Sequence, residues 1–464
     1  MDPLSLRKIA ELAQGSLTAP DEGVTVSRVS TDSRTLQPGD LFVPLRGENF
    51  DGHKFVEQAY ERGAVGAMVE QNWKSAAPKT FALIRVPDTL AGYQTLAANY
   101  RKSLPLKAIV ITGSNGKTST KDFLAATFSR RFRVTKTEGN FNNHVGLPQT
   151  ILAASSSDEI AVWEIGMNHP GEIAALSKIA APDAAIITNV GLAHIEFMGS
   201  REAIALEKGA LAEAIGAAGT VVLNADDPSS EAIAGRTRAK VILAGIEKGS
   251  VRAIEVSQSP TGCEFTILEG AHRCRAQLPV PGIHMVQNAI LAVAAGRAFG
   301  LSLEDCAAGL ASAPLTKARL QIKEINGIQF IDDSYNANPD SMKAALRTLV
   351  ELDADGRRIA VLGEMSELGE ESERGHREVG EAAADFGIDE LIAVGPTGAA
   401  IARAAGKAGL KKSVGVNGAV EAAELLGEIA SPGDLILVKG SRSARMERVL
   451  EAFSQLPSTA EATP

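Results

Sequence analysis

The stretch Ile111-Thr-Gly-Ser-Asn-Gly-Lys-Thr-Ser-Thr120 decides the fold of the central part of the chain. An apolar run at residues 107–111 precedes it and predicts a buried strand, whereas residues 118–130 predict a helix. A glycine-rich turn between a strand and a helix directs backbone N–H groups and the positive helix end at phosphate. The sequence therefore predicts a phosphate-binding loop here.

The spacing of this loop is shorter than in the general P-loop. The general pattern has its first glycine five residues before the Gly-Lys-Thr, where this chain has Ile111. Gly113 instead lies three residues before Gly116, which favours a nucleotide-binding subfamily other than the switch GTPases. A chance Gly-Lys-Thr turn is the weaker alternative, because the strand and helix flank it. The residues expected to contact nucleotide are Gly113, Asn115, Gly116, Lys117, Thr118 and Ser119.

The composition is that of a soluble globular protein, with 45% hydrophobic and 22% charged residues. A chain of 464 residues exceeds one core and predicts roughly two to four domains. The net charge of −9 argues against a nucleic-acid partner, because a phosphate backbone requires a basic surface. An acidic protein that binds ATP must concentrate its positive charge locally, as Lys117 would do.

The cysteines and the amino terminus bear on cellular location. Three cysteines without a C-x-x-C pair fit a reducing compartment and predict no zinc site. Residues 1–17 contain charges and lack the apolar core of a signal peptide. The sequence has no apolar run long enough for a membrane span. We therefore expect a cytoplasmic protein.

Residues 1–104 are predicted to form a small α/β domain. A helical pattern covers residues 53–63, and strand signals lie at residues 25–29, 40–44 and 67–70. The sequence Ser103-Leu-Pro105 breaks the helix that precedes the phosphate-loop strand, so we place the first boundary there.

Residues 105–313 alternate strand and helix, as a parallel sheet does. The predicted strands lie at residues 107–112, 160–165, 184–189, 220–224 and 240–244. Residues 251–278 change to short alternating strands without a helix, which predicts an antiparallel appendage. A long helix is predicted at residues 283–299.

Residues 314–456 restart the alternation and predict a second doubly wound domain. Its strands are expected at residues 328–332, 358–362, 390–394 and 434–438, and the small, polar tail 457–464 is expected to be disordered. The predicted fold class is therefore α/β with three domains. These are a small α/β substrate domain, a central P-loop ATPase-like parallel sheet and a C-terminal Rossmann-like domain.

Three side chains follow strands of the central segment, where the active sites of α/β proteins collect. Glu164 ends the second predicted strand and could hold Mg²⁺ together with Thr118; a solvated strand-end acid is the alternative. His194 follows the third strand, although a lone histidine is more often structural than catalytic. Lys208 lies fourteen residues later on a helix predicted at 201–215, where an ordinary surface lysine is the alternative.

The loop Asp332-Asp-Ser-Tyr-Asn-Ala-Asn-Pro-Asp340 follows an apolar strand and precedes a helix that begins near Pro339. Asp340 or Ser341 could merely cap that helix. Capping does not account for the tyrosine and both asparagines, so we predict a ligand-contact loop.

Two further loops are rich in polar groups. Val438-Lys-Gly-Ser-Arg-Ser-Ala-Arg-Met-Glu447 has three cations and two serines and suits an anionic ligand or a carboxylate. A plain helix start with surface charge is the alternative. Thr137-Glu-Gly-Asn-Phe-Asn-Asn143 is dense in amides and too irregular for a strand.

Together these segments resemble the Mur ligase family, the ATP-dependent ligases that build the peptidoglycan stem peptide. The resemblance covers nearly the whole chain and matches the three-domain order of that family. It rests on Gly139-Asn-Phe-Asn-Asn143, Asp333-Ser-Tyr-Asn-Ala-Asn-Pro339, Gly363-Glu-Met-Ser-Glu-Leu-Gly369 with His376, and Val438-Lys-Gly-Ser-Arg-Ser443. The Asp-Asn-Pro-Arg motif of the family member that adds the third amino acid is absent from the sequence.

The resemblance implies an ATP-dependent amide ligase of peptidoglycan precursor synthesis. Its substrates would be UDP-N-acetylmuramoyl-tripeptide and D-alanyl-D-alanine, joined through an acyl phosphate by a monomeric enzyme. The alternatives are another Mur-type or folylpolyglutamate synthetase-like amide ligase, or a P-loop regulatory ATPase. Residues 1–104 argue against a folylpolyglutamate synthetase-like enzyme, because that relative lacks a dedicated UDP-substrate domain.

The resemblance also implies a metal site with two Mg²⁺ ions. Thr118 and Glu164 match the first ion's ligands, and His194 with Glu164 matches the second. Lys208 falls at the family's carbamylated lysine, although the Ala-Leu-Glu before it departs from the family pattern. Lys117, His194 and Lys208 are therefore expected to be catalytic.

Ligand contacts follow from the same resemblance. Nucleotide contacts are expected from Asn288, Arg319, Asp333, Tyr335 and Asn336. Ser33 and Arg34 are expected to hold the UDP part of the substrate, with a turn-forming Asp-Ser pair as the alternative. The other substrate contacts are expected from Asn140, Asn142, Asn143, Asn338, Lys439, Ser441 and Arg442.

Overall fold

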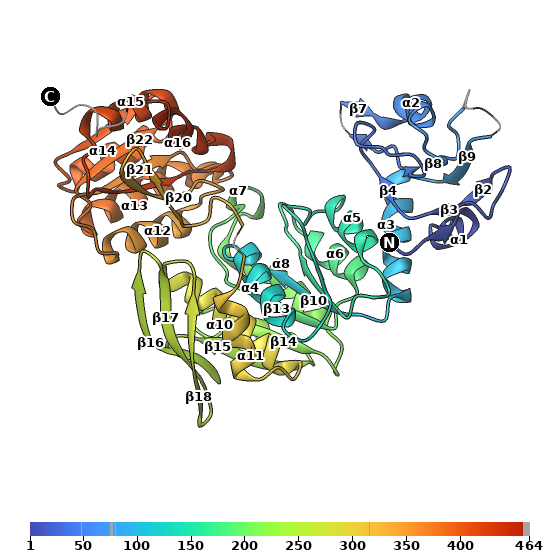
Figure 1. Cartoon of the computed structure of the whole chain (residues 1–464), viewed down its shortest axis with the longest axis horizontal. Helices are drawn as coiled ribbons and strands as arrows, with labels where there is room; N and C mark the ends of the chain where they lie inside the picture. The colour runs from blue at the N-terminus through green and yellow to red at the C-terminus, as the bar shows by residue number, and fades with distance from the viewer. Residues whose placement is uncertain (48, 75–77, 79, 315, 458–464) are drawn as a thin grey trace.

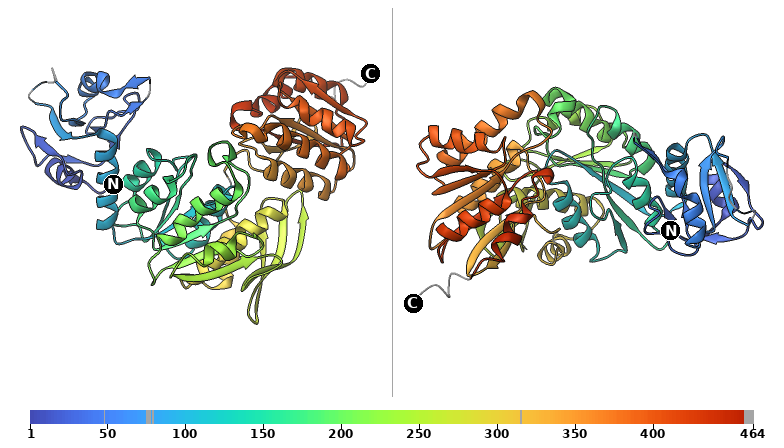
Figure 2. Two further views of the ribbon diagram at one scale, coloured as in Figure 1. Left: turned by 180° about the vertical axis from the view of Figure 1, so that it is seen from behind. Right: turned by 90° about the horizontal axis from the view of Figure 1, so that it is seen from above.

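The computed structural model describes residues 1–47, 49–74, 78, 80–314 and 316–457. It contains three α/β regions in chain order. The N-terminal and C-terminal regions lie at opposite ends of an elongated molecule, with the central region between them (Figures 1 and 2). The expected α/β fold class is confirmed.

The N-terminal region is built on a five-stranded sheet with the order β2-β9-β8-β5-β4. These strands are β2 (Ser16–Thr18), β9 (Ala82–Val86), β8 (Gly66–Glu70), β5 (Leu41–Phe42) and β4 (Val29–Ser30). Two short pairs accompany the sheet, β1 (Leu4–Ser5) with β3 (Thr25–Val26) and β6 (Arg46–Gly47) with β7 (Phe50–Asp51). The predicted strand 25–29 is divided in two, because Val26 pairs with Leu4 in one sheet and Val29 with Leu41 in another.

The helices of this region are α1 (Leu6–Leu12), η1 (Gly52–Phe55), α2 (Val56–Glu61) and α3 (Thr89–Ser103). The side chain of Asp88 caps the start of α3, and the helix ends two residues before Pro105, as the sequence predicts. Helix α3 packs against the central region, where the Tyr100 hydroxyl donates to the carbonyl of Ala154 at 2.8 Å. This helix therefore joins the first two regions.

The central region has a nine-stranded sheet with the order β11-β12-β10-β13-β14-β15-β16-β17-β18. Its strands are β10 (Lys107–Thr112), β11 (Val134–Lys136), β12 (Ile160–Glu164), β13 (Ala184–Ile187), β14 (Thr220–Asn224), β15 (Lys240–Gly245), β16 (Val251–Ser259), β17 (Gly262–Glu269) and β18 (His272–Leu278). The first six strands in chain order are parallel. Strand β17 is antiparallel to both β16 and β18, as expected for residues 251–278. Because β16 pairs in parallel with β15, these three strands extend the central sheet.

Helices cover this sheet and bring the phosphate loop into place. They are α4 (Lys117–Phe128), α5 (Gly146–Ala153), α6 (Glu172–Ala180), α7 (Ile195–Met198), α8 (Arg201–Glu213), α9 (Ser230–Ala234), α10 (Ile283–Ala298) and α11 (Leu303–Ala311). Helix α4 packs against α10 and α11. Because β10 and most of α4 are buried, the loop between them has a rigid base.

The C-terminal region has a six-stranded sheet with the order β19-β20-β24-β21-β22-β23. Its strands are β19 (Gln321–Ile325), β20 (Ile328–Asp333), β21 (Arg358–Gly363), β22 (Glu390–Val394), β23 (Ser413–Val416) and β24 (Leu435–Lys439). Only the β19–β20 pair is antiparallel, and the last strand in sequence lies inside the sheet. The helices are α12 (Pro339–Glu351), η2 (Gly369–Glu371), α13 (Ser372–Asp385), α14 (Ala399–Lys407), α15 (Ala419–Ile429), η3 (Arg442–Ala444) and α16 (Glu447–Phe453).

Two further predictions concern the C-terminal tail and membrane-spanning helices. Residues 458–464 of the tail that was expected to be disordered lie outside the described residues. Within the described part of the chain, no helix has the length and apolar character needed to cross a membrane.

Candidate active site

A cleft of about 1980 Å³ lies between the central and C-terminal regions. Residues that follow β10, β12, β13 and β14 line one wall, and residues that follow β20 and β24 line the other. The cleft therefore gathers the carboxyl ends of parallel strands from two sheets, where α/β proteins bind ligands.

The phosphate loop packs so closely that two of its glycines cannot be replaced without movement. Gly116 precedes α4 with a φ of 79°, and a Cβ there would lie 2.1 Å from the amide oxygen of Asn288. At Gly113 the φ is 151°, and a Cβ would lie 1.8 Å from Thr188 Oγ1. The predicted nucleotide residue Asn288 therefore supports the loop from α10.

Lys117 is held within the loop. Its ammonium donates to the carbonyl of Gly113 at 2.7 Å. Burial lowers the pKa of Lys117, although the nearby carboxylate of Glu164 opposes that shift. No carboxylate among the described residues forms a direct ion pair with this ammonium, so an anionic ligand would meet an unneutralised charge.

Thr118 and Glu164 lie together as the sequence predicts. The Thr118 hydroxyl donates to Glu164 Oε2 at 2.9 Å, and the Asn142 amide donates to the other carboxylate oxygen at 2.8 Å. The hydroxyl of the buried Thr137 accepts the backbone N–H of Glu164 at 2.9 Å. Hydroxyl and carboxylate oxygens are the ligands that Mg²⁺ prefers, so this pair fits that ion.

The structure places His194 beside a residue of the C-terminal region. Its Nδ1 lies 2.6 Å from Glu367 Oε2, and the pKa of Glu367 is lowered by this contact with the histidine. No hydrogen bond or ion pair joins His194 to Glu164 in the described residues. Within the same residues, no three His, Cys, Asp or Glu side chains converge as a ready metal site.

Lys208 is buried in α8 with 1% of its surface exposed, so the surface-lysine alternative is wrong. Burial lowers the pKa of Lys208 well below its usual value, and the Lys117 charge adds to this effect, whereas Glu207 opposes it. Its ammonium has no hydrogen-bond partner among the residues that the structure describes. The side chain therefore favours the neutral amine.

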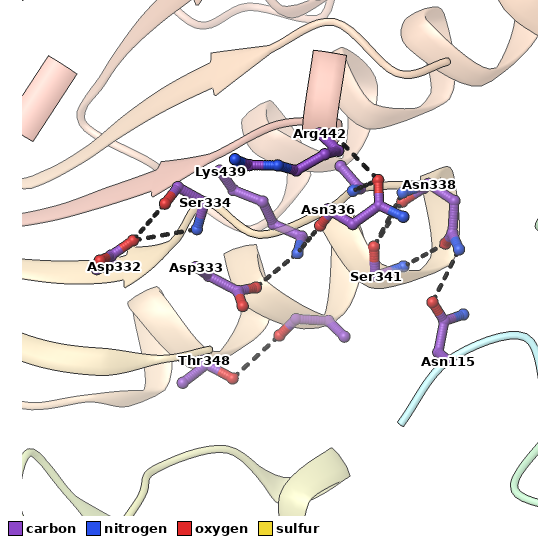
Figure 3. A network of polar contacts seen from close by, with 12 residues as sticks. Asn115, Asp332, Asp333, Ser334, Asn336, Asn338, Ser341, Thr348, Lys439 and Arg442 are labelled. Atoms are coloured by element: carbon purple, nitrogen blue, oxygen red, sulfur yellow. Dashed lines mark hydrogen bonds and ion pairs between the residues drawn. The ribbon is translucent and has the colours of Figure 1, made fainter. Parts of the chain in front are cut away.

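The loop after β20 meets the loop after β24 in a polar network (Figure 3). The buried ammonium of Lys439 lies 2.6 Å from Asp333 Oδ2 and donates to the carbonyl of Asn336 at 2.9 Å. The Asn336 amide oxygen in turn accepts the backbone N–H of Arg442 at 3.3 Å. Because Asp333 neutralises Lys439, that lysine shapes the loop and is not a free cation of the cleft.

Asn338 caps α12 and also reaches the phosphate loop. Its side chain accepts the N–H of Ser341, and the Ser341 hydroxyl accepts the N–H of Asn338, which completes a capping box. The Asn338 amide donates to Asn115 Oδ1 at 2.8 Å (Figure 3). Asp340 does not cap the helix through its side chain but accepts the N–H of Leu192 at 3.0 Å. The start of α12 therefore contacts the central region at two points.

Arg319 reaches from the segment before β19 into the phosphate site. Its Nη2 donates to Thr118 Oγ1 at 3.2 Å, and its guanidinium lies 4.4 Å from the ring centroid of Tyr335. A cation over an aromatic face is held by the electrons of the ring. Arg319 and Tyr335 thus meet next to Thr118.

The remaining predicted substrate residues fall in two places. Asn140, Asn142, Asn143, Asn338, Lys439, Ser441 and Arg442 line the cleft. Ser33 and Arg34 lie in the N-terminal region and do not line it. Arg34 is paired with Asp32, and this hydrogen bond lowers the pKa of the Asp32 carboxyl to about 2.

Sequence reasoning missed further residues of the cleft, among them two with shifted pKa values. His284, at the start of α10, lines the cleft, and burial lowers its pKa to about 4, with Asp333 opposing the shift and Lys439 adding to it. Glu367 belongs to the 363–369 motif, which the sequence singled out without giving any of its residues a role. His376 supports that motif by accepting the N–H of Met365 at 3.0 Å. The sequence signal that could have identified Glu367 is its place in the loop that follows β21. No local sequence pattern distinguishes His284.

Three family models match successive parts of the chain. The Mur ligase family, catalytic domain, matches residues 25–100, and the Mur ligase middle domain matches residues 111–296. The Mur ligase, glutamate ligase domain, matches residues 318–442. Together these models span most of the chain.

The chain is also similar to curated relatives over nearly its full length. It is 41% identical to the UDP-N-acetylmuramoyl-tripeptide–D-alanyl-D-alanine ligase of Bacillus subtilis, covering 98% of this chain and 99% of the relative. It is 36% identical to the ligase of the same name from Escherichia coli, with 98% and 99% coverage.

Solved structures give the same result. A crystal structure of MurF from Acinetobacter baumannii matches with a TM-score of 0.91 and 33% identity, covering 98% of this chain and all of that one. MurF ligase from Thermotoga maritima in complex with ADP matches with a TM-score of 0.82 and 29% identity, covering 92% and 97%. The similarity therefore extends through all three regions.

Proposed function

The chain belongs to the Mur ligase family, and from that premise we propose that it joins D-alanyl-D-alanine to UDP-N-acetylmuramoyl-tripeptide at the expense of ATP. The observation that carries the proposal is the full-length similarity to relatives of that name, at 41% and 36% identity. The ADP complex of the Thermotoga maritima structure supports a nucleotide in the cleft. The product is a cytoplasmic precursor of peptidoglycan.

The proposal assigns one task to each part of the chain. Residues 1–104 hold the UDP part of the substrate, where Ser33 and Arg34 lie apart from the cleft. Residues 105–313 hold ATP, and residues 314–456 bring the dipeptide. The proposed enzyme acts as a monomer.

The chemistry is a two-step activation of a carboxylate. The terminal carboxylate of the tripeptide attacks the γ-phosphate of ATP, so an acyl phosphate forms and ADP leaves. The amine of D-alanyl-D-alanine then attacks the acyl carbon, loses a proton and displaces phosphate. Two anions meet in the first step, and Lys117, whose ammonium has no paired carboxylate, offsets their repulsion. Closure of the cleft protects the acyl phosphate from water.

We further propose two Mg²⁺ ions in this site. Thr118 and Glu164 would hold one, and Glu164, His194 and a carbamate on Lys208 would hold the other. Bound Mg²⁺ supplies positive charge to phosphate oxygens. The neutral amine of the buried Lys208 is the form that can add CO₂ and release a proton, giving an anionic carbamate. The close Thr118–Glu164 pair supports the first site.

The test is the release of ADP by the purified protein with UDP-N-acetylmuramoyl-tripeptide, with and without D-alanyl-D-alanine. We expect sustained turnover only when ATP and both substrates are present. Turnover that ignores the dipeptide would point to a different amide ligase of the family. Turnover that ignores both substrates would point to a regulatory ATPase and overturn the proposal.

A further inference from the structure

The segment that connects the second and third regions lies along the helix of the phosphate loop. We call residues 316–320 the connecting segment. Its Thr316 hydroxyl donates to Asp122 Oδ2 at 2.6 Å, and its Arg319 donates to Thr118 Oγ1 at 3.2 Å. Thr118 and Asp122 are four residues apart in α4 and therefore share one face of the helix. The two ends of the segment are thus fixed to one face.

The backbone around Arg319 needs such support. Ala318 has a φ of 59° and Leu320 a φ of 51°, both in the left-handed region that residues with a Cβ disfavour. Such conformations persist when surrounding contacts impose them. The contacts here are the hydrogen bond from the Tyr335 N–H to the Ala318 carbonyl, at 3.2 Å, and the burial of Leu320.

The Asp122 acceptor is itself firmly held. The carboxylate is 2% exposed, and Lys136 donates to its Oδ1 at 2.9 Å. The buried ammonium of Lys121 lies 3.5 Å from the same oxygen and donates to the Thr137 carbonyl at 2.8 Å. A buried, charged acceptor makes a stronger hydrogen bond than a solvated neutral one. The Thr316 contact is therefore a strong anchor for the connecting segment.

These contacts close a ring around the phosphate site. The Thr137 carbonyl accepts the Lys121 ammonium, and the Thr137 hydroxyl accepts the backbone N–H of Glu164. The Glu164 carboxylate in turn accepts the hydroxyl of Thr118. Thr118 in turn accepts Arg319. These contacts therefore link Thr316 to Arg319 and include Thr118 and Glu164, which line the cleft.

We infer that Thr316 and Asp122 are positioning residues that hold the connecting segment so that the Arg319 guanidinium is presented at the phosphate site. The inference rests on the proposed function for its kinetic consequence, because Arg319 would act there on ATP. The action of Thr316 through Arg319 affects nucleotide binding, which does not depend on the reaction that the protein catalyses. Loss of the anchor would let the disfavoured backbone around Arg319 relax and withdraw the guanidinium.

The test is a double-mutant cycle between Thr316→Val and Arg319→Ala, with Thr316→Ser as the conservative variant. Removing a hydrogen bond to a charged group predicts about a tenfold loss in kcat/KM for ATP in Thr316→Val, with a similar rise in the Kd for the analogue AMPPCP. Thr316→Ser keeps the hydroxyl and should restore most of both values. Added to Arg319→Ala, Thr316→Val should cause no further loss, because residues that act through one another are not additive.

Ser312→Ala is the matched control, because that hydroxyl precedes the connecting segment and bonds only to carbonyls of α11. Thermal unfolding of each variant checks that it is folded. Wild-type values in Thr316→Val, an equal loss in Ser312→Ala, or a further tenfold loss on Arg319→Ala would overturn the inference. If the wild type does not form the amide, the proposed function fails, and the AMPPCP cycle still decides the role of Thr316.

Discussion

Two lysines, the half-buried Lys117 and the buried Lys208, lie close enough for the charge of Lys117 to lower the pKa of Lys208. Burial lowers the pKa of both groups, and a nearby carboxylate opposes the shift in each case, Glu164 at Lys117 and Glu207 at Lys208. The pKa of Lys208 is lowered well below its usual value, because the charge of Lys117 adds to the effect of burial. A charged Lys117 would suit phosphate, and a neutral Lys208 would suit reaction with CO₂.

The first residue prediction concerns the cation. Lys117→Ala should leave the fold intact and lower kcat/KM for ADP release by at least about a hundredfold, because the charge that offsets the meeting anions is lost. Steady-state ADP release and circular dichroism measure the two effects. Lys178→Ala, an exposed position on α6, is the control and should match the wild type. Near-normal turnover of Lys117→Ala would contradict the assignment.

The second residue prediction concerns the amine. Protein equilibrated with ¹³C-bicarbonate should show a carbamate carbon signal by NMR that is missing in Lys208→Ala. The expected cause is the lowered pKa of Lys208, which supplies the neutral amine that adds CO₂. Lys178→Ala should keep the signal. A spectrum that is identical in the wild type and Lys208→Ala would rule out this modification.

The third residue prediction is a pH dependence of stability. His284 titrates near pH 6.5 in the unfolded chain, but its pKa is about 4 in the folded protein. Between these values the unfolded chain binds more protons, so stability falls as the pH drops. His284→Gln should lose less stability than the wild type between pH about 7.5 and about 5, measured by urea unfolding. His272→Gln, on an exposed part of β18, should behave as the wild type does.

The residues of the cleft show what sequence could and could not give. Thr118 and Glu164 follow neighbouring parallel strands, and their meeting at 2.9 Å follows from that topology. His194 and Glu367 lie in different regions, so their contact depends on the arrangement of those regions. His284 has no sequence signature because its low pKa is a consequence of tertiary burial.

At the scale of elements, the start of α12 has two functions that can be separated. Asn338 caps the helix with its oxygen and contacts Asn115 with its nitrogen. Asn338→Ala should lower the free energy of unfolding by about 1 kcal/mol through loss of the cap. Asn338→Asp keeps the cap oxygen and should retain stability while losing the donor to Asn115.

Urea unfolding and kcat/KM for ATP distinguish the two Asn338 variants. Both variants should lower kcat/KM, because Asn115 belongs to the phosphate loop. Ser302→Ala, which removes the side-chain cap of α11 away from the cleft, should lower stability alone. If Asn338→Asp matched the wild type in kcat/KM, the contact between Asn338 and Asn115 would not contribute to the use of ATP.

Elements with strong periodicity were predicted well, and edge strands were not. The predicted strand 107–112 matches β10, whose residues are apolar and buried along almost the whole strand. Strands β19 and β23 were missed, because they are partly exposed at the two edges of the C-terminal sheet and have little apolar signal. The sequence predicted antiparallel strands for residues 251–278. It did not predict that β16 would pair with β15, because no local sequence pattern contains that tertiary pairing.

At the scale of the whole molecule, several polar contacts join the C-terminal region to the central one, including two that lie outside the connecting segment and the phosphate loop. Asp340 accepts the N–H of Leu192, and Glu367 meets His194. Interfaces of this polar kind permit motion between domains. Asp340→Ala combined with Glu367→Ala should increase the radius of gyration of the unliganded protein, measured by small-angle X-ray scattering. Glu378→Ala, which removes contacts within the C-terminal region, should leave it unchanged, and an unchanged double variant would contradict the prediction.

The position of β24 has a consequence for how the protein is made. This strand is the last in sequence, yet it pairs with β20 on one side and β21 on the other. During translation those two strands emerge first and have no partner between them, so the backbone N–H and C=O groups along their facing edges stay unpaired until residue 439 has left the ribosome. The C-terminal region can therefore complete its sheet only once β24 has emerged and been inserted between β20 and β21.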